Sequence, residues 1–128
     1  MAPKWLFWPA PAGGDVTPDA VDWTDAFGNA EDWVSTEYET VSGINTTISL
    51  SVSWVVTTGS FSLRYRIGVG AFVNLTTNPQ TITVSNNDQI LFQLLSVDPF
   101  TESRADITVT NASDSNTILD TFYILAST

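Results

Sequence analysis

The chain has 128 residues, which suits one domain with a hydrophobic core and is too short for two domains of ordinary size. Four Lys and Arg residues against fourteen Asp and Glu residues give a formal net charge of −10, which disfavours nucleic acid and anionic membranes as partners. Without Cys or His, the chain lacks thiolate nucleophiles, Cys-based zinc ligands and the commonest general base, so we expect no enzyme activity, no cofactor and no metal site.

Residues 1–19 are predicted to form an extended arm, because they hold four of the six prolines together with a Gly-Gly pair. An apolar run inside the arm is interrupted by Pro9 and Pro11 and is too short for a secretory signal or a membrane span, so we expect an unprocessed start. The same run is the main candidate for contact with another protein, since exposed aromatic clusters mark interaction sites. Its residues are Trp5, Leu6, Phe7 and Trp8.

From residue 20 to residue 128, short runs of alternating apolar and polar residues are separated by turn residues, which is typical of strands. The clearest run is Thr46–Trp54, where every second residue is apolar. A turn is expected at 26–30 and a loop at 75–80. The predicted strands cover 21–23, 33–41, 46–54, 61–67, 82–84, 89–96, 105–110 and 118–124.

The stretch Thr81–Val97 is predicted to be a β-hairpin around which the other strands pack. Its two apolar arms flank the turn residues Asn86, Asn87 and Asp88. The second arm is apolar on both faces, so we expect it at the centre of a sheet. Seven or eight short strands with almost no helix signal predict one all-β domain, an antiparallel β-sandwich over 20–128.

Four motifs in this order give the chain a family resemblance over roughly residues 15–126. They read T-P-D-A-V-D-W-T-D, V-S-G-I-N-T-T-I-S-L-S-V, Y-R-I-G-V-G-A-F and I-T-V-S-N-N-D-Q-I-L-F-Q. Together they resemble the immunoglobulin-like β-sandwich module that recurs in structural proteins of tailed bacteriophages and in some bacterial surface proteins. The resemblance implies an architectural role in the virion, as a capsid decoration (cement) protein on the head or as a tail, baseplate or fibre subunit. Its partners would be the major capsid protein or other virion subunits, with several copies assembled on the particle.

Two basic residues form a second candidate contact. Arg64 and Arg66 alternate with apolar residues in the predicted strand 61–67, so they share one exposed strand face. On a protein with ten more acidic than basic groups, this face would offset the repulsion between neighbouring copies.

Pairs of carboxylates are the remaining chemistry that the sequence offers. Asp22 with Asp25, Glu37 with Glu39, or Asp98 with Glu102 have the residue types that glycoside hydrolysis requires, but fourteen acids on a small domain make such pairs common by chance. Calcium uses the same oxygen ligands, yet the chain has no calcium-loop motif. We therefore expect solvated surface carboxylates.

Tryptophans supply the alternative from a different functional class. Trp23, Trp33 and Trp54 would line a carbohydrate-binding face if their rings were exposed, because flat aromatics stack on sugars. Trp54 lies in an alternating strand, which favours a position in the core between two sheets. A carbohydrate-binding β-sandwich module with a glycan partner is thus the second hypothesis.

Overall fold

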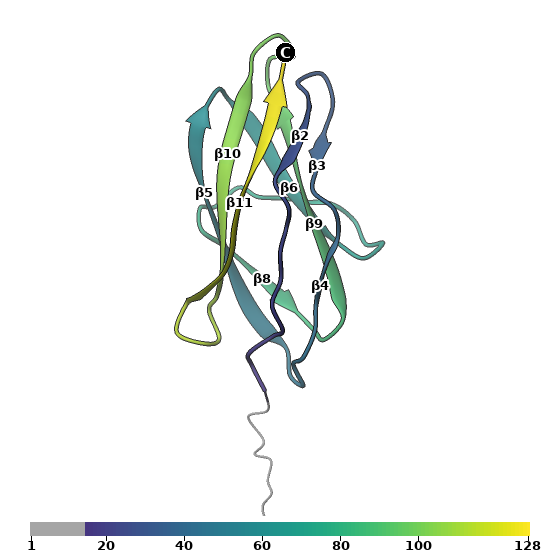
Figure 1. The fold of residues 1–128 in the computed structure, drawn as a ribbon, viewed down its shortest axis with the longest axis vertical. Coiled ribbons are helices and arrows are strands. Elements are labelled where there is room, and N and C mark those ends of the chain that lie inside the picture. The colour runs from purple at the N-terminus through teal and green to yellow at the C-terminus, as the bar shows by residue number, and fades with distance from the viewer. Residues whose placement is uncertain (1–14) are drawn as a thin grey trace, which may run out of the picture.

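The computed structural model describes residues 15–128, and these form a β-sandwich of two sheets (Figure 1). This confirms the all-β prediction. The described residues contain no helix, and therefore none long and apolar enough to cross a membrane. The strands are β2 (Ala26–Asn29), β3 (Val34–Ser35), β4 (Glu39–Val41), β5 (Ile48–Thr58), β6 (Phe61–Ile67), β7 (Val73–Asn74), β8 (Gln80–Val84), β9 (Asp88–Ser96), β10 (Ser103–Asn111) and β11 (Thr117–Ser127).

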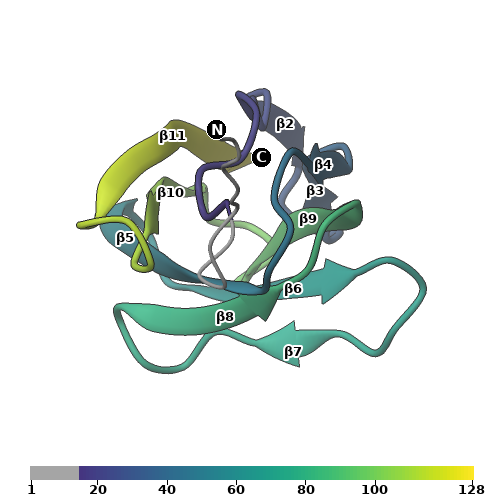
Figure 2. The same cartoon turned by 90° about the horizontal axis from the view of Figure 1, so that it is seen from below.

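The first sheet has the order β2-β11-β10-β5-β8, and the second has the order β3-β9-β6-β7 with β4 also paired to β9. Viewed along the long axis, the sheets wrap around a shared interior (Figure 2). Every strand pair of the described residues is antiparallel except β2 with β11, which is parallel. The first sheet is therefore mixed. β2 is parallel to β11 because the chain from residue 15 to β2 runs in the same direction as β11.

Alternating burial fills the space between the sheets. In β5, Ile48, Leu50 and Val52 are at most 1% exposed, and the serines between them are only partly covered. β10 alternates in the same way over its whole length, with Ile107 and Val109 fully buried. Burying each such side chain contributes about 1.5–3 kcal/mol, so the period of two specifies which face of each strand points inward.

Three aromatic rings form the centre of the core. The Trp23 ring lies 5.4 Å from Phe92 in an edge-on arrangement and 5.9 Å from Phe122, whose ring lies 5.5 Å from Phe92. The buried indole N–H of Trp23 donates to the Ile90 carbonyl oxygen at 2.8 Å. This cluster joins the two sheets, because Phe92 belongs to β9 and Phe122 to β11.

The predicted hairpin is wrong, although its turn is present. β8 pairs with β5 in the first sheet, whereas β9 pairs with β3, β4 and β6 in the second. The turn residue Asn87 has a φ of +71° and donates its N–H to Val41, so the connection carries the chain from one sheet to the other. The central position expected for the second arm is confirmed, since β9 has partners on both sides.

The first predicted elements are also misplaced. Val21 and Trp23 are buried in alternation as expected, but they form no strand, because the N–H groups of Asp22 and Trp23 donate to the side chains of Glu39 and Asp120. The expected turn at 26–30 is instead strand β2. The strand expected over 33–41 is divided into β3 and β4, because the Thr36 hydroxyl replaces a backbone acceptor for the Phe92 N–H.

Candidate functional site

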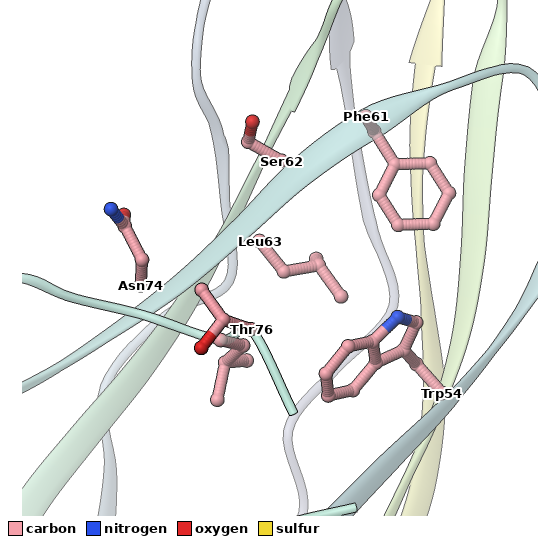
Figure 3. Close-up of a pocket in the computed structure, with 7 residues that line it drawn as sticks. Trp54, Phe61, Ser62, Leu63, Asn74 and Thr76 are labelled. Carbon is pink, nitrogen blue, oxygen red and sulfur yellow. The ribbon is translucent and has the colours of Figure 1, made fainter. Parts of the chain in front are cut away.

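A pocket of about 230 Å³ opens between the two sheets at the side of β5, and we call it the Trp54 pocket. The Trp54 indole, the Phe61 ring and the Leu63 side chain face the same space (Figure 3). Leu63 and Leu75 are almost fully buried, so the inner wall is apolar. Polar residues stand at the opening. The lining residues are Trp54, Phe61, Ser62, Leu63, Asn74, Leu75 and Thr76.

The turn between β5 and β6 creates this pocket. Gly59 has a φ of +72°, a conformation that glycine adopts without strain, and it turns the chain from the first sheet into the second. Trp54, opposite Ile107 on β10, and Phe61 therefore reach one pocket from different sheets. Leu75 and Thr76 were expected in a loop, and no signal in the sequence marked them as pocket residues.

The backbone polar groups of Trp54 are hydrogen-bonded, whereas its indole N–H is not. Its backbone N–H and C=O are both bonded to the Asn78 side chain, at 3.2 Å and 2.7 Å. Asn78 thus continues the edge of β5 beyond β8, whose pairing ends at Val52. The hydrogen bonds of Trp54 within residues 15–128 are made by its backbone, and its indole, which borders the pocket, donates to no acceptor there. The pocket therefore offers an apolar wall together with polar groups that include the Trp54 indole N–H.

The outer face of the second sheet carries both basic residues predicted to form a contact, and we call it the Arg64 face. The Arg64 guanidinium carbon lies 3.7 Å from the Trp33 ring centroid and 3.8 Å from that of Phe72. Its Nε donates to Gln93 Oε1 at 2.7 Å. Burial lowers the pKa of Arg64. Cation–π contacts and one hydrogen bond thus hold this cation in place.

Arg66 lies beside this stack, with its guanidinium carbon 5.0 Å from the Phe72 ring. Both arginines are half-buried rather than fully exposed, because they cover the outward side of β9, including the buried Leu91. Within residues 15–128 neither forms an ion pair, whereas Arg104 lies 3.0 Å from Asp106. The Arg64 face therefore presents positive charge on an acidic body.

The first described residues are fixed at one end of the sandwich, which we call the N-terminal pole. Asp15 donates its N–H to the Asn45 side chain, and Asp19 donates to the Ser42 carbonyl oxygen at 2.8 Å. The buried Asn111 donates to the Val16 carbonyl oxygen at 2.8 Å. The C-terminus lies at the opposite end (Figure 1). The predicted contact residues Trp5, Leu6, Phe7 and Trp8 lie outside the described residues.

The three tryptophans proposed for a sugar-binding face do not form one. Trp23 is 1% exposed at the centre of the core. Trp33 is on the Arg64 face, and Trp54 lines the Trp54 pocket while also packing against the core. A common stacking platform for sugars is therefore contradicted, although Trp54 does border a pocket.

Three of the six carboxylates considered for catalysis accept hydrogen bonds from the backbone. Asp25 accepts the Tyr123 N–H at 2.9 Å, and Asp98 accepts the Phe100 N–H at 2.9 Å. Glu39 accepts the Asp22 N–H at 3.0 Å. In the described range, no group of three or more Asp and Glu side chains is arranged to hold a metal ion.

Asp120 lies near these groups, and its pKa is raised. Burial is the main cause, and the negative charges of Asp22 and Glu39 add to it, while hydrogen bonds from the Trp23 and Thr121 N–H groups oppose it. Because the folded pKa exceeds the unfolded value, ionising Asp120 destabilises the fold as the pH rises above the usual Asp pKa of about 3.9.

Replacing Glu39 with glutamine is expected to lower the pKa of Asp120, because it removes a negative neighbour and retains an acceptor for the Asp22 N–H. The variant should gain stability over the wild type at pH 7 and lose that gain below the usual Asp pKa. Carboxyl carbon NMR titration and urea unfolding measure the two effects. Glu37→Gln, at an exposed position, is the control, and an equal shift there would contradict the charge explanation.

Comparison with known proteins adds little to this geometry. No protein-family model matches the chain, and no curated protein matches it either. Among solved structures, the N-terminal domain of PorA is similar at 16% identity with a TM-score of 0.39, over 86% of this chain and 87% of that one. A likeness this weak carries no argument about family or function.

Proposed function

We propose that the chain is a structural protein of a bacteriophage virion, specifically a capsid decoration protein attached to the head surface in several copies. A tail, baseplate or fibre position is the alternative within this class. The major capsid protein is the proposed partner for the head. The resemblance supports this role, because its four motifs cover the N-terminal pole, β4 and β5, β6, and the connection from β8 to β9.

The N-terminal pole is the observation that carries the proposal. Side-chain bonds from Asn45 and Asn111 fix residues 15 and 16, so the apolar sequence Trp5–Trp8 is joined to the body at one end of the sandwich. An attachment segment at one end leaves the opposite end and both sheet faces free. This arrangement suits a domain that stands on a surface.

The size of the apolar run indicates why several copies are needed. Burying its four side chains removes roughly 700 Å² of apolar surface, which contributes about 17 kcal/mol as an upper limit. Ordering about eight residues costs about 12 kcal/mol. A single segment thus binds modestly, whereas copies linked in one assembly bind tightly through effective concentration.

Deleting residues 1–12 is expected to abolish binding to particles while the sandwich stays folded, because the fixed residues begin at Asp15. Purified heads depleted of this chain would be mixed with the full chain or the truncated chain, and co-sedimentation would measure binding. Circular dichroism would check the fold.

The matched control is Phe100→Ser, which removes an aromatic side chain that is 82% exposed and lies outside the N-terminal segment. It should bind heads as the wild type does. Equal binding by the truncated chain, or failure of that chain to fold, would refute attachment through the N-terminal segment. Binding to tails but not to heads would favour the alternative location.

Carbohydrate binding is the second candidate, and the Trp54 pocket favours it. Trp54 borders a hollow that also has the polar residues Asn74 and Thr76 at its opening. A glycan array separates the two functions. Strong glycan binding that Trp54→Ala removes, without binding to particles, would support a carbohydrate-binding module.

A further inference from the structure

We propose that the Trp54 pocket receives an aromatic side chain from the Trp5–Trp8 segment of a second copy of this chain. The inference rests on the proposed function only in taking that segment, which is proposed there to attach the chain to the head, as an apolar contact segment. It adds the receiving site, which is a different surface from the segment. Copies would then associate head to tail.

The chemistry of the pocket matches an aromatic side chain attached to a peptide. Its inner wall is apolar, with Phe61, Leu63 and Leu75, and its volume of about 230 Å³ is several times the roughly 30 Å³ that one water occupies. An aromatic ring would displace solvent from this space and pack against Trp54, as buried aromatic anchors do in interfaces. A carbonyl oxygen of the incoming peptide would accept the free Trp54 indole N–H.

The edge of β5 favours insertion of a side chain over addition of a strand. The Asn78 side chain already bonds both backbone groups of Trp54, at 2.7 Å and 3.2 Å. An incoming strand would have to displace both bonds to pair with β5 at this position. Pro3, Pro9 and Pro11, on either side of the segment, also lack the N–H donors that addition of a longer strand needs. An aromatic ring that enters the pocket displaces neither Asn78 hydrogen bond and needs no backbone N–H donor.

The distance along the chain favours a second copy over the same molecule. Asp15 is bonded to Asn45 at the N-terminal pole, and Trp54 is six residues beyond the start of β5, or about 20 Å at 3.3 Å per residue. Residues 15–23 run from this pole into the body. A same-chain contact would therefore require a reversal near Gly13, and the five residues from there to Trp8 span only about 16 Å.

Trp5 lies three residues farther along the chain from Gly13 than Trp8 does. It would reach the pocket of its own molecule only if the whole stretch ran straight across a curved surface. A second copy has no such limit. The net charge of −10 makes copies repel one another, so association is expected to strengthen with salt, in contrast to an interface held by ion pairs.

The test uses complementary variants of the full chain, because donor and receiver are different surfaces. Trp5→Ser with Trp8→Ser removes the donor, and Thr76→Arg obstructs the opening of the pocket at an exposed position. In sedimentation velocity at about 0.5 M NaCl, the wild type should form oligomers. Each variant alone should associate at least about tenfold more weakly. Their equimolar mixture should form a heterodimer through the one intact contact.

Thr83→Arg, at an exposed position on β8 outside the pocket, is the matched control and should associate as the wild type does. Trp54→Ala is a second receiver variant, and its thermal unfolding would be compared with that of the wild type. A mixture that stays monomeric while the wild type associates would overturn the inference. So would a glycan-array signal that Thr76→Arg abolishes.

The outcomes are distinct from those of the proposed function. A wild type that is monomeric in solution but binds heads through residues 1–12 would overturn the head-to-tail contact and leave the decoration role intact. A wild type that associates through the pocket but binds no particle would support the contact and remove the decoration role.

Discussion

Replacing Trp23 with alanine is expected to lower the free energy of unfolding by about 3–5 kcal/mol, the usual cost of removing a buried large aromatic. Trp23 is 1% exposed and packs on Phe92 and Phe122, which belong to different sheets. The substitution also leaves the Ile90 carbonyl oxygen without its donor. Urea unfolding followed by far-UV circular dichroism measures the loss.

Trp33→Ala is the matched control, because it removes the same side chain from a half-buried position. Its loss should be limited to the contact with Arg64 and partial burial, about 1–2 kcal/mol. Similar losses for the two variants would contradict the assignment of Trp23 as the link between the sheets.

Replacing Gly59 with alanine is expected to cost about 3 kcal/mol or more, because two effects add. The φ of +72° disfavours any residue with a Cβ. The added Cβ would also lie inside van der Waals contact with the Glu102 carbonyl oxygen and Ser103 Oγ, and 3.0 Å from Ser103 Cα. Backbone atoms cannot yield as a flexible side chain does, so the turn between the sheets would shift.

Gly68→Ala isolates the first effect. Gly68 has a φ of +58°, and a Cβ there meets no atom within 4 Å, so the expected cost is about 1 kcal/mol. Thermal unfolding of the two variants side by side gives the contribution of the close approach. Equal losses would show that the contact with β10 is unimportant.

Local physical chemistry determined the strands and several turns. The part of β5 from Ile48 to Trp54 follows from apolar side chains at every second residue, because successive residues of a strand point to opposite faces. The last residues of β5, Val55 to Thr58, do not alternate in this way, and a turn was expected at Thr57 and Thr58. The turn at Asn86–Asp88 follows from residues that tolerate positive φ. The alternation of Arg64 and Arg66 likewise placed both on one strand face, which the structure confirms as the outer face of the second sheet.

Tertiary structure decided which strands pair and which residues meet. Alternation specifies the buried face of β8 and β9, but the backbone groups of a strand pair equally well with any neighbour, so the hairpin could not be told from a connection between sheets. That Trp23 lies outside any strand could not be predicted for a similar reason, because its backbone N–H donates to the carboxylate of Asp120, 97 residues away. The stacking of Arg64 between Trp33 and Phe72 joins residues from separate strands and loops. The Trp54 pocket exists only after β5 and β6 enter different sheets, because its walls come from segments whose proximity no local pattern encodes.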